Sequence, residues 1–557
     1  MDFVIFQDNK PFILESFRNG DFDYIDAASE VFETDFFKFI EAKSILQKLA
    51  QTYPTPRKKE DVPLWFYVAS NLSMRLHGVH SFNAFPMVVR CGGMLNAFGP
   101  EAGRKVIHPD TGDVTIASEG FNKKNHYDRE APCDQDFLRK MAKDTDAEAL
   151  MRWFCDDVIR VFRSRRAFDK EGIFIGDASY LFVPDNPNYE GSVKLLFDHN
   201  DHPITQKEYE KLTDEQKIHC QLRRCYKMVT LLHTNPNLDF FLFVAVKVVS
   251  GKDHECPVLY ELVKHFVEVV GKGVMKRLIL DRGFIDGKAI SICKKQYDTD
   301  ILIPVRRNMD IYEDAMALFR ESDVDWLCCN EQVAEVKNPP RPRPKVIVNR
   351  EKKRQEKIQQ LKQEKQSPPP EKTLLKMEAA FIGEFSSWSS CTVPLSVVAN
   401  REHYADGHQE TWLLIDTKEV QDPSKDKELY HMRTATEERY RQFKCFIDLT
   451  NFTSCAFSMV VNQVVFSMLA YNLLQLHLLN KGRKELNKKT LPRVRQQLLP
   501  SDNHIIVYNQ NYYAMFKPIE LIEFLMTLGE EARNKIAEKC RRLRLEMKGI
   551  LRNPRPP

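Results

Sequence analysis

The spacing of apolar residues changes along the chain and predicts where helices give way to strands. Apolar side chains recur at helical spacing in three early segments, 35–53, 62–99 and 133–165. After them the apolar residues form short runs rich in β-branched and aromatic side chains, bounded by Asp, Asn, Pro and Gly. These runs predict consecutive strands over 172–183, 192–198, 226–234 and 240–249.

The second half of the chain alternates between the two patterns. An amphipathic helix is expected over 257–273, with buried strands on the segments 274–284 and 300–307 that follow. A small antiparallel sheet, formed by strand-like runs, is expected before helix returns at 435–449. These runs are 379–388, 392–400 and 410–420.

The segment 452–479 is almost wholly apolar and predicts one long helix. Four amides interrupt it: Asn462, Gln463, Asn472 and Gln475. Polar groups on several sides favour burial within the protein over contact with lipid, so no membrane partner is expected.

Composition narrows the class of protein. With 557 residues, 43% hydrophobic and 29% charged, the chain is long enough for several globular units. The first residues lack the pattern of a secretory signal, which predicts a cytoplasmic location. The 13 cysteines follow neither zinc-ligand nor disulfide spacing, so we expect free thiols.

Charge is distributed unevenly although the net charge is only +4. Residues 1–36 are acidic, whereas 337–376 and 533–557 are strongly basic. Between its prolines the first basic segment predicts an exposed helix or a partly disordered arm. Both basic segments are candidate phosphate-binding surfaces, and the alternative is that they are solvated helix faces.

Two aspartates follow apolar runs. Asp177 ends the alternation GIFIGD, and Asp281 ends the run MKRLILD. A carboxylate at the edge of a core needs a compensating partner, and a divalent cation suits several carboxylates that converge. The alternative is that each aspartate merely forms a turn at a strand end.

The segment LYHMRTATEERYRQFK carries four functional side-chain types at helical spacing. On one continuous helix, Tyr430, Arg433, Glu437 and Lys444 would project from one side. An amphipathic surface helix with ordinary ion pairs would give the same pattern.

This spacing resembles the Y-R-E-K signature of the insertion-sequence 4 family of DDE transposases, which cut and paste DNA. The resemblance covers about residues 170–480, and DRGF after the second aspartate is similar to the family's usual context. It implies a ribonuclease-H-like fold interrupted by a β-rich insertion. It also implies catalytic, metal-binding carboxylates at Asp177, Asp281 and Glu437.

The resemblance also implies the chemistry. Two Mg²⁺ ions, for which Mn²⁺ can substitute, would be held by the three carboxylates. Arg433 and Lys444 would bind phosphates at the transposon end, and Tyr430 another. Trp388 and Trp412 are candidates for stacking a displaced base, although a tryptophan in a small sheet more often belongs to the core.

The sequence therefore predicts an α/β protein in five segments. They are a helical DNA-binding region (1–165), the first part of the catalytic domain (166–310), a basic arm with a β-rich insertion (311–425), the last part of the catalytic domain (426–480) and a basic helical tail (481–557).

The expected partners follow from transposition. They are double-stranded DNA, as terminal inverted repeats and as target, and a second copy in a synaptic complex. The expected location is the nucleoid of a prokaryotic host. The alternatives are a catalytically silent DNA-binding descendant and a structure-specific nuclease on the same fold.

Overall fold

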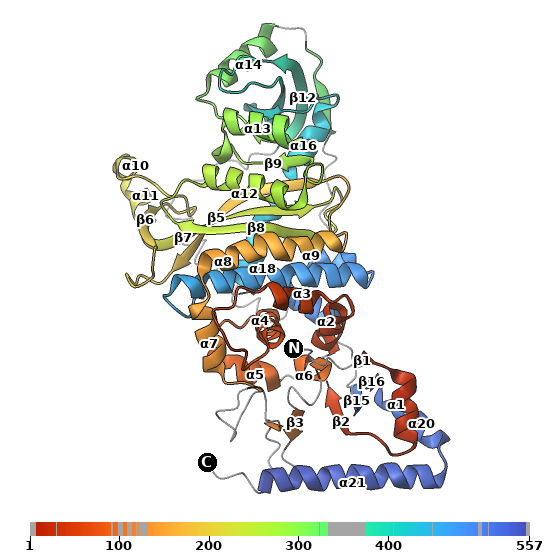
Figure 1. Ribbon diagram of the computed structural model, residues 1–557. Coiled ribbons are helices and arrows are strands. Elements are labelled where there is room, and N and C mark those ends of the chain that lie inside the picture. The colour runs from red at the N-terminus through yellow and green to blue at the C-terminus, as the bar shows by residue number, and fades with distance from the viewer. Residues whose placement is uncertain are drawn as a thin grey trace, which may run out of the picture. The chain divides into compact units, whose positions relative to one another are not determined.

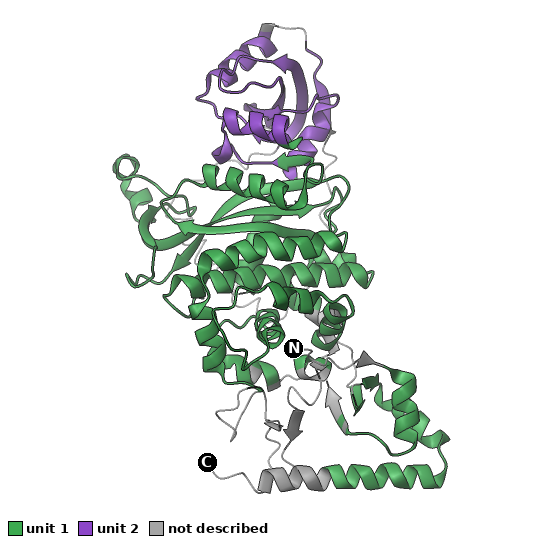
Figure 2. Cartoon of the chain, viewed as in Figure 1, with its two compact units in different colours: residues 1–278, 297–299, 432–557 green, residues 279–296, 300–431 purple. Residues whose placement is uncertain are grey.

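The structure is a computed structural model whose described residues form two compact units. The described residues are 7–28, 31–90, 93–98, 104–107, 114–117, 121, 132–321, 324–331, 374–404, 406–447, 449, 451–498, 504–510 and 512–552. Unit 1 comprises 1–278, 297–299 and 432–557, and unit 2 comprises 279–296 and 300–431 (Figure 2). Both units mix helices and strands, so the α/β class is confirmed.

A twisted sheet forms the centre of unit 1. Its long strand β7 (Gln221–Thr234) pairs antiparallel with β5 (Ile173–Val183), β6 (Val193–Phe197) and β8 (Phe241–Ser250). The four strands predicted between 172 and 249 are thus confirmed. β5 is buried at each of its first five positions, which explains its nearly continuous apolar run.

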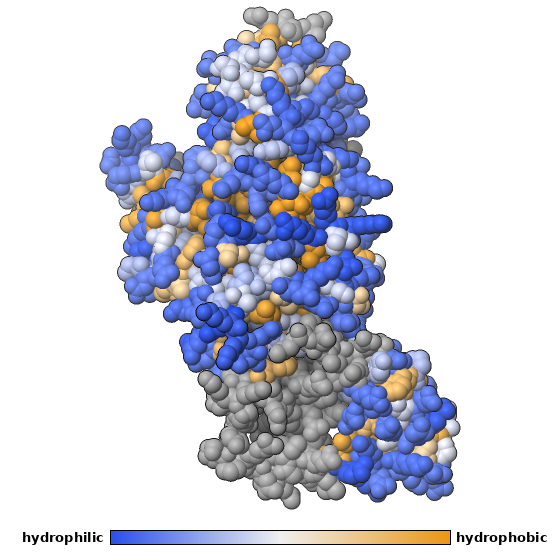
Figure 3. Space-filling model, viewed as in Figure 1, coloured by the Kyte–Doolittle hydropathy of each residue, from blue (hydrophilic) through white to orange (hydrophobic). Residues whose placement is uncertain are grey.

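Helix α12 (Glu255–Val270) follows β8 and lies along the sheet (Figure 1). The His254 side chain accepts a hydrogen bond from the first turn, and Gly271, at φ 90°, ends the helix. The chain then enters β9 (Arg277–Ile279), where Lys276 N and Arg277 N donate to Gly172 O at 3.0 Å. The view in Figure 3 shows a largely hydrophilic surface with apolar patches around α12 and the neighbouring strands.

Several helices of unit 1 gather around α18 (Phe457–Asn480), which contacts α2, α4, α7, α8 and β8. The helices of unit 1 between its two ends are α2 (Val31–Ala42), α3 (Ile45–Thr52), α4 (Leu64–Leu76), α5 (Phe85–Arg90), α6 (Gly93–Phe98), α7 (Gln135–Asp144), α8 (Ala147–Trp153), the π-helix η2 (Phe154–Val158), α9 (Ile159–Ser164), α10 (Gln206–Glu210), α11 (Asp214–Lys217), α17 (Thr434–Phe446) and α19 (Leu491–Leu498). The helices predicted in the first 165 residues are confirmed.

Helix α18 is long and apolar enough to span a membrane by length and composition. However, 89% of its most apolar window is buried inside the protein. Its amides bond to the protein interior: Asn472 Oδ1 accepts from Phe243 N at 2.8 Å, and its Nδ2 donates to Phe243 O at 2.7 Å. Gln475 Oε1 accepts from Phe241 N at 3.1 Å. The prediction of a buried protein helix is confirmed.

The two ends of the chain form a second sheet within unit 1, in the order β1-β16-β15-β2. Its strands are β1 (Gln7–Asp8), β2 (Tyr24–Ala28), β15 (His504–Asn509) and β16 (Tyr512–Phe516). Around its core pack α1 (Lys10–Arg18), α20 (Pro518–Thr527) and α21 (Glu530–Arg552). Strands β3 (Arg104–Ile107) and β4 (Val114–Ala117) form a separate two-stranded antiparallel sheet. The two terminal regions, which the sequence predicted to be helical, therefore also contain strands.

Unit 2 holds an antiparallel sheet in the order β11-β12-β13-β14-β10. Its strands are β10 (Asp300–Pro304), β11 (Leu327–Glu331), β12 (Leu374–Phe385), β13 (Leu395–Tyr404) and β14 (Gln409–Asp416), and its helices are α13 (Gly287–Tyr297), α14 (Asp310–Glu321) and α16 (Pro423–His431). The predicted insertion sheet is confirmed, and it also includes β10 and β11. Of the basic segment 337–376, only residues 374–376 are among the described residues, and they begin β12.

Candidate active site

Strand β5 places Asp177 inside the sheet of unit 1. Asp177 is the fifth residue of the strand, pairs with Thr230 on β7 and is only 9% exposed. The sequence suggested that this aspartate ends its strand, but β5 continues to Val183 because backbone pairing with β7 continues. A buried carboxylate in mid-strand needs a charged partner even more than one at a strand end.

Helix α17 packs on this part of the sheet and carries Glu437. Tyr440, one turn further along, is buried, and its Oη lies 2.6 Å from Thr230 Oγ1 in a hydrogen bond. Burial first, and then the charge of Asp177, raise the pKa of the Tyr440 phenol well above its usual value. Tyr440 therefore anchors α17 beside Asp177 as a neutral hydroxyl, while Glu437 remains exposed.

A second anchor on α17 is the buried side chain of Arg439. Its guanidinium donates to Tyr471 Oη and to Asn487 O, both at 3.2 Å, and lies 4.3 Å from the Phe241 ring centroid. These contacts tie α17 to α18 and to the start of β8. The position of Glu437 is therefore set by packing on both sides of its helix.

Arg433 joins the two acids of unit 1. Its Nη2 lies 2.6 Å from Glu437 Oε1, and its Nη1 lies 3.8 Å from Asp177 Oδ2. The Arg433 and Asp177 side chains are 19% and 13% exposed, so solvent screens their interaction only partly, whereas the Glu437 side chain is 55% exposed and its pair is screened more. One cation thus holds two carboxylates that come from distant parts of the sequence.

Lys444 lies near the same strand as Asp177. Its Nζ donates to Ser179 Oγ at 2.9 Å, and Ser179 is two residues beyond Asp177, on the same face of β5. Burial lowers the pKa of the Lys444 ammonium from its ordinary value, although Asp201 and Asp177 oppose this shift. Asp448, the alternative partner four residues away, lies outside the described residues.

The spacing of the four signature residues predicted one continuous helix, but the structure distributes them over two helices and the turn between them. Helix α16 ends at His431 and α17 begins at Thr434, so Arg433 lies in the turn between them. Tyr430 belongs to α16 in unit 2, where its ring packs 5.9 Å from that of Trp412. Arg433, Glu437 and Lys444 belong to unit 1.

Asp281 follows β9 and precedes a 3-10 turn, so its expected place at a strand end is confirmed. It belongs to unit 2, where the adjacent Leu280 N donates to Leu302 O of β10 at 3.0 Å. Among the described residues no group of three His, Cys, Asp or Glu side chains is close enough to form a metal site. The oxygen donors of Asp177 and Glu437 nevertheless fit a hard divalent cation, because one guanidinium already interacts with both.

Sequence reasoning missed the residues that support the site. Ser179, Thr230 and Tyr440 contact the candidate residues or anchor their helix. The spacing of Ser179 from Asp177 and of Tyr440 from Glu437 was a usable signal, since each lies on the same face of its element. Thr230 could be found only from strand register.

Trp412 is partly buried and packs against a core cluster of unit 2. Its ring lies against the cluster of Leu302, Val398, Leu414 and Val420, and its Nε1 donates to Glu402 Oε1 at 3.0 Å. These contacts favour the core interpretation of this tryptophan.

The protein is thus of mixed α/β class. Its site brings Asp177 of the central strand β5 and Glu437 of the late helix α17 to the guanidinium of Arg433. Comparison with protein families identifies the class. Residues 189–473 match the family model described as a transposase DDE domain, and this match spans more than half of the chain. The protein therefore belongs to the family of DDE transposases. No curated protein matches the chain.

The match includes Asp281 and Glu437 but begins after Asp177. Membership implies a DNA substrate and a transposase or nuclease activity, and DDE transposases generally use divalent metal ions. Asp177 is assigned to the site on its contacts alone.

Proposed function

We propose that the protein is a cut-and-paste transposase of the insertion-sequence 4 type, which cleaves DNA at transposon ends and joins them to target DNA. The observation that carries this proposal is the bridge from Asp177 through Arg433 to Glu437. It brings together two acids of the expected triad and the arginine of the expected signature.

The strand order supports a ribonuclease-H-like catalytic domain. In unit 1, β5 lies between β7 and β9, β8 lies beyond β7, and α12 connects β8 to β9. The first acid on β5, the second after β9 and the glutamate on a late helix follow the order expected for this fold. The β-rich segment between Asp281 and Glu437 corresponds to the expected insertion.

Each proposed role follows from the side chain's environment. Asp177, Asp281 and Glu437 would hold two Mg²⁺ ions, whose bound charge stabilises the attacking and leaving oxygens of a phosphodiester. Asp177, which is buried and fixed in a strand, suits a ligand shared by both ions, and exposed Glu437 suits a ligand open to substrate. Arg433, Lys444 and Tyr430 would bind phosphates of the DNA end.

The reaction needs no nucleophile from the protein. Water would be positioned for the first cut, and the released 3′-hydroxyl would then attack target DNA at the same carboxylates. Two copies, each holding one end, would form the synaptic complex.

The proposal is tested with the full-length protein and a supercoiled plasmid carrying the DNA that flanks its reading frame. We expect nicking at the element ends and joining to a second plasmid when Mg²⁺ or Mn²⁺ is present, and neither reaction in EDTA. DNA binding without cleavage in either metal would instead identify a silent descendant. Cleavage that ignores the flanking sequence and yields no joined product would identify a structure-specific nuclease.

A further inference from the structure

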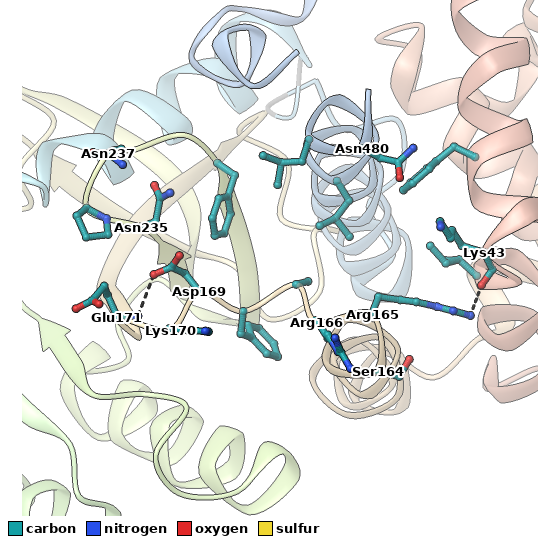
Figure 4. Close-up of a pocket in the computed structure, with 18 residues that line it drawn as sticks. Lys43, Ser164, Arg165, Arg166, Asp169, Lys170, Glu171, Asn235, Asn237 and Asn480 are labelled. Atoms are coloured by element: carbon teal, nitrogen blue, oxygen red, sulfur yellow. Dashed lines mark hydrogen bonds between the residues drawn. The ribbon is translucent and has the colours of Figure 1, made fainter. Parts of the chain in front are cut away.

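A cavity of about 990 Å³ lies in unit 1, and none of the candidate active-site residues lines it. The segment Ser164–Glu171 after α9 forms one wall, and the turn 235–237 between β7 and β8 forms another (Figure 4). Lys43, between α2 and α3, and Asn480, the last residue of α18, complete the rim. The size is within the range of small-molecule sites.

The lining combines an apolar surface with a basic rim. Its apolar members include Phe39, Phe168, Phe240, Leu476 and Leu479. Its charged members are four cations, Lys43, Arg165, Arg166 and Lys170, and two acids, Asp169 and Glu171.

None of the four cations makes an ion pair with another described residue, although Arg165 donates to the backbone carbonyl of Lys43. The carboxylate of Asp169 bonds within its own segment, because its Oδ1 accepts a hydrogen bond from Glu171 N at 2.9 Å. With four cations and two carboxylates in its lining, the cavity keeps a net formal charge of +2 (4 − 2).

Arg166 stands in a backbone conformation that normally favours glycine. Its φ is 56°, and it closes α9 with a Schellman motif. In this motif Ala167 N donates to Phe162 O at 3.1 Å and Arg166 N donates to Arg163 O at 3.0 Å.

Three other helices of the chain end with the same pair of hydrogen bonds and use glycine at this position. They are α1, α4 and α18, with Gly20, Gly78 and Gly482 at φ values of 72°, 69° and 67°. A side chain is disfavoured there relative to glycine. Ser44 after α2 and Asp298 after α13 also adopt positive φ, so Arg166 is one of several non-glycine residues in this conformation, and glycine at its position would relieve the backbone strain.

The wall that carries these cations is held in place. Arg165 donates to Lys43 O. Asp169 N donates to His233 Nε2 at 2.9 Å, while His233 Nδ1 bonds to Ile173 O at 2.9 Å. Burial lowers the pKa of His233 to about 4, so the imidazole is neutral at pH 7 and keeps both bonds. Arg166 and Lys170 therefore project from a fixed backbone.

We infer that this cavity binds nucleotides of a single DNA strand, with phosphates at Lys43, Arg166 and Lys170 and bases against the apolar lining. Figure 4 shows Lys43 and Lys170 on opposite sides of the cavity, so cations stand on both of its sides. Bases stacked inside a duplex cannot enter a concave site, whereas an unpaired base can pack on aromatic side chains. The inference rests on the proposed function for its choice of DNA as the ligand.

The test is binding of a fluorescent single-stranded oligonucleotide by the full-length protein in EDTA, where no metal-dependent cleavage occurs. We expect Arg166→Gly and Arg166→Gln each to weaken binding about 3- to 10-fold, with the salt slope of log affinity shallower by about 0.7 per lost phosphate contact. Arg166→Gly should also keep or raise the melting temperature, because glycine suits the end of α9 better. Arg152→Gln, an equal charge change at an exposed position of α8, should alter neither property.

Unchanged affinity in both Arg166 variants, or an equal loss in Arg152→Gln, would overturn the inference. An equal loss for duplex DNA would overturn the assignment to a single strand. Displacement of the oligonucleotide by a nucleoside monophosphate at equal concentration would overturn it in favour of a small-molecule site. Because binding is measured without metal, loss of the proposed cleavage activity would leave this result unaffected.

Discussion

Replacing Asp177, Asp281 or Glu437 singly with the matching amide should lower DNA cleavage at least ~100-fold and leave affinity for the DNA ends within about two-fold. Loss of a residue that only supports a metal ligand typically costs about 10- to 100-fold, so loss of a ligand should cost at least the upper end of that range. The amide keeps the size of each side chain but removes its negative charge. Nicking rates and gel shifts on the same preparations separate chemistry from binding.

The matched control for Glu437→Gln is Glu438→Gln. Glu438 is the next residue of α17, and its Oε2 lies 2.7 Å from Arg441 Nε, so its ion pair points away from the bridge through Arg433. This variant should cleave at nearly the normal rate. If any of the three amide variants kept more than a few per cent of normal cleavage, that residue would not belong to the metal site.

Lys444→Ala should slow processing of the DNA ends by about 10- to 100-fold, because a hydrogen bond to a charged group contributes about 1.5–3 kcal/mol. The Lys444 ammonium bonds to Ser179, which lies two residues after Asp177 on β5. From this position it would bind a phosphate next to the cleaved bond. Metal affinity should change little, since Lys444 is not a ligand. End cleavage, Mn²⁺ affinity and melting temperature are measured on one preparation.

Ser179→Ala distinguishes the two roles of Lys444. If Lys444 served only to hold β5 and α17 together, then removing its hydroxyl partner would reproduce the effect of Lys444→Ala. With a role in DNA binding, Ser179→Ala should retain most of the cleavage activity. Normal cleavage by Lys444→Ala would contradict that role.

The run of apolar residues predicted the strands of the central sheet but misplaced Asp177 within its strand. The expected strand covered 172–183, but the apolar alternation stops at Asp177, so this aspartate was interpreted as the polar end of the core strand. The ladder to β7 continues from Asp177 to Val183 because backbone hydrogen bonds do not depend on the side chain. What compensates the buried charge is Arg433, which lies far away in the sequence.

The break between α16 and α17 could not be predicted from the sequence either, because no local residue causes it. Residues 432 and 433 include no glycine or proline, and Arg433 itself has helical angles, φ −55° and ψ −35°. The interruption comes from tertiary packing: α16 packs on β12 and β13, whereas α17 packs on β5. Helical spacing correctly grouped Arg433 with Glu437, whose contact spans one turn, but it could not show that Tyr430 belongs to another unit.

The sheet at the chain ends lay beyond local pattern reading because its strands are distant in sequence. β15 and β16 form a short hairpin whose other partners are β2 and β1 near the start of the chain. The tail 481–557 was predicted to be helical, which α21 confirms for Glu530–Arg552. The strands β15 and β16, which precede that helix, were not predicted. The cavity beside Arg166 was equally invisible, since it joins segments from four parts of the chain.

The most direct test of the proposed metal site is cleavage of the polypeptide by a bound iron ion. Fe²⁺ that replaces Mg²⁺ in the full-length protein, supplied with ascorbate and peroxide, produces radicals that cut the chain close to its ligands. We expect cuts near Asp177, Asp281 and Glu437, all of them suppressed by excess Mg²⁺ and lost together in Asp177→Asn. Cuts near Asp177 and Glu437 without one near Asp281, or cuts that persist in Asp177→Asn, would contradict a single site formed by the three carboxylates.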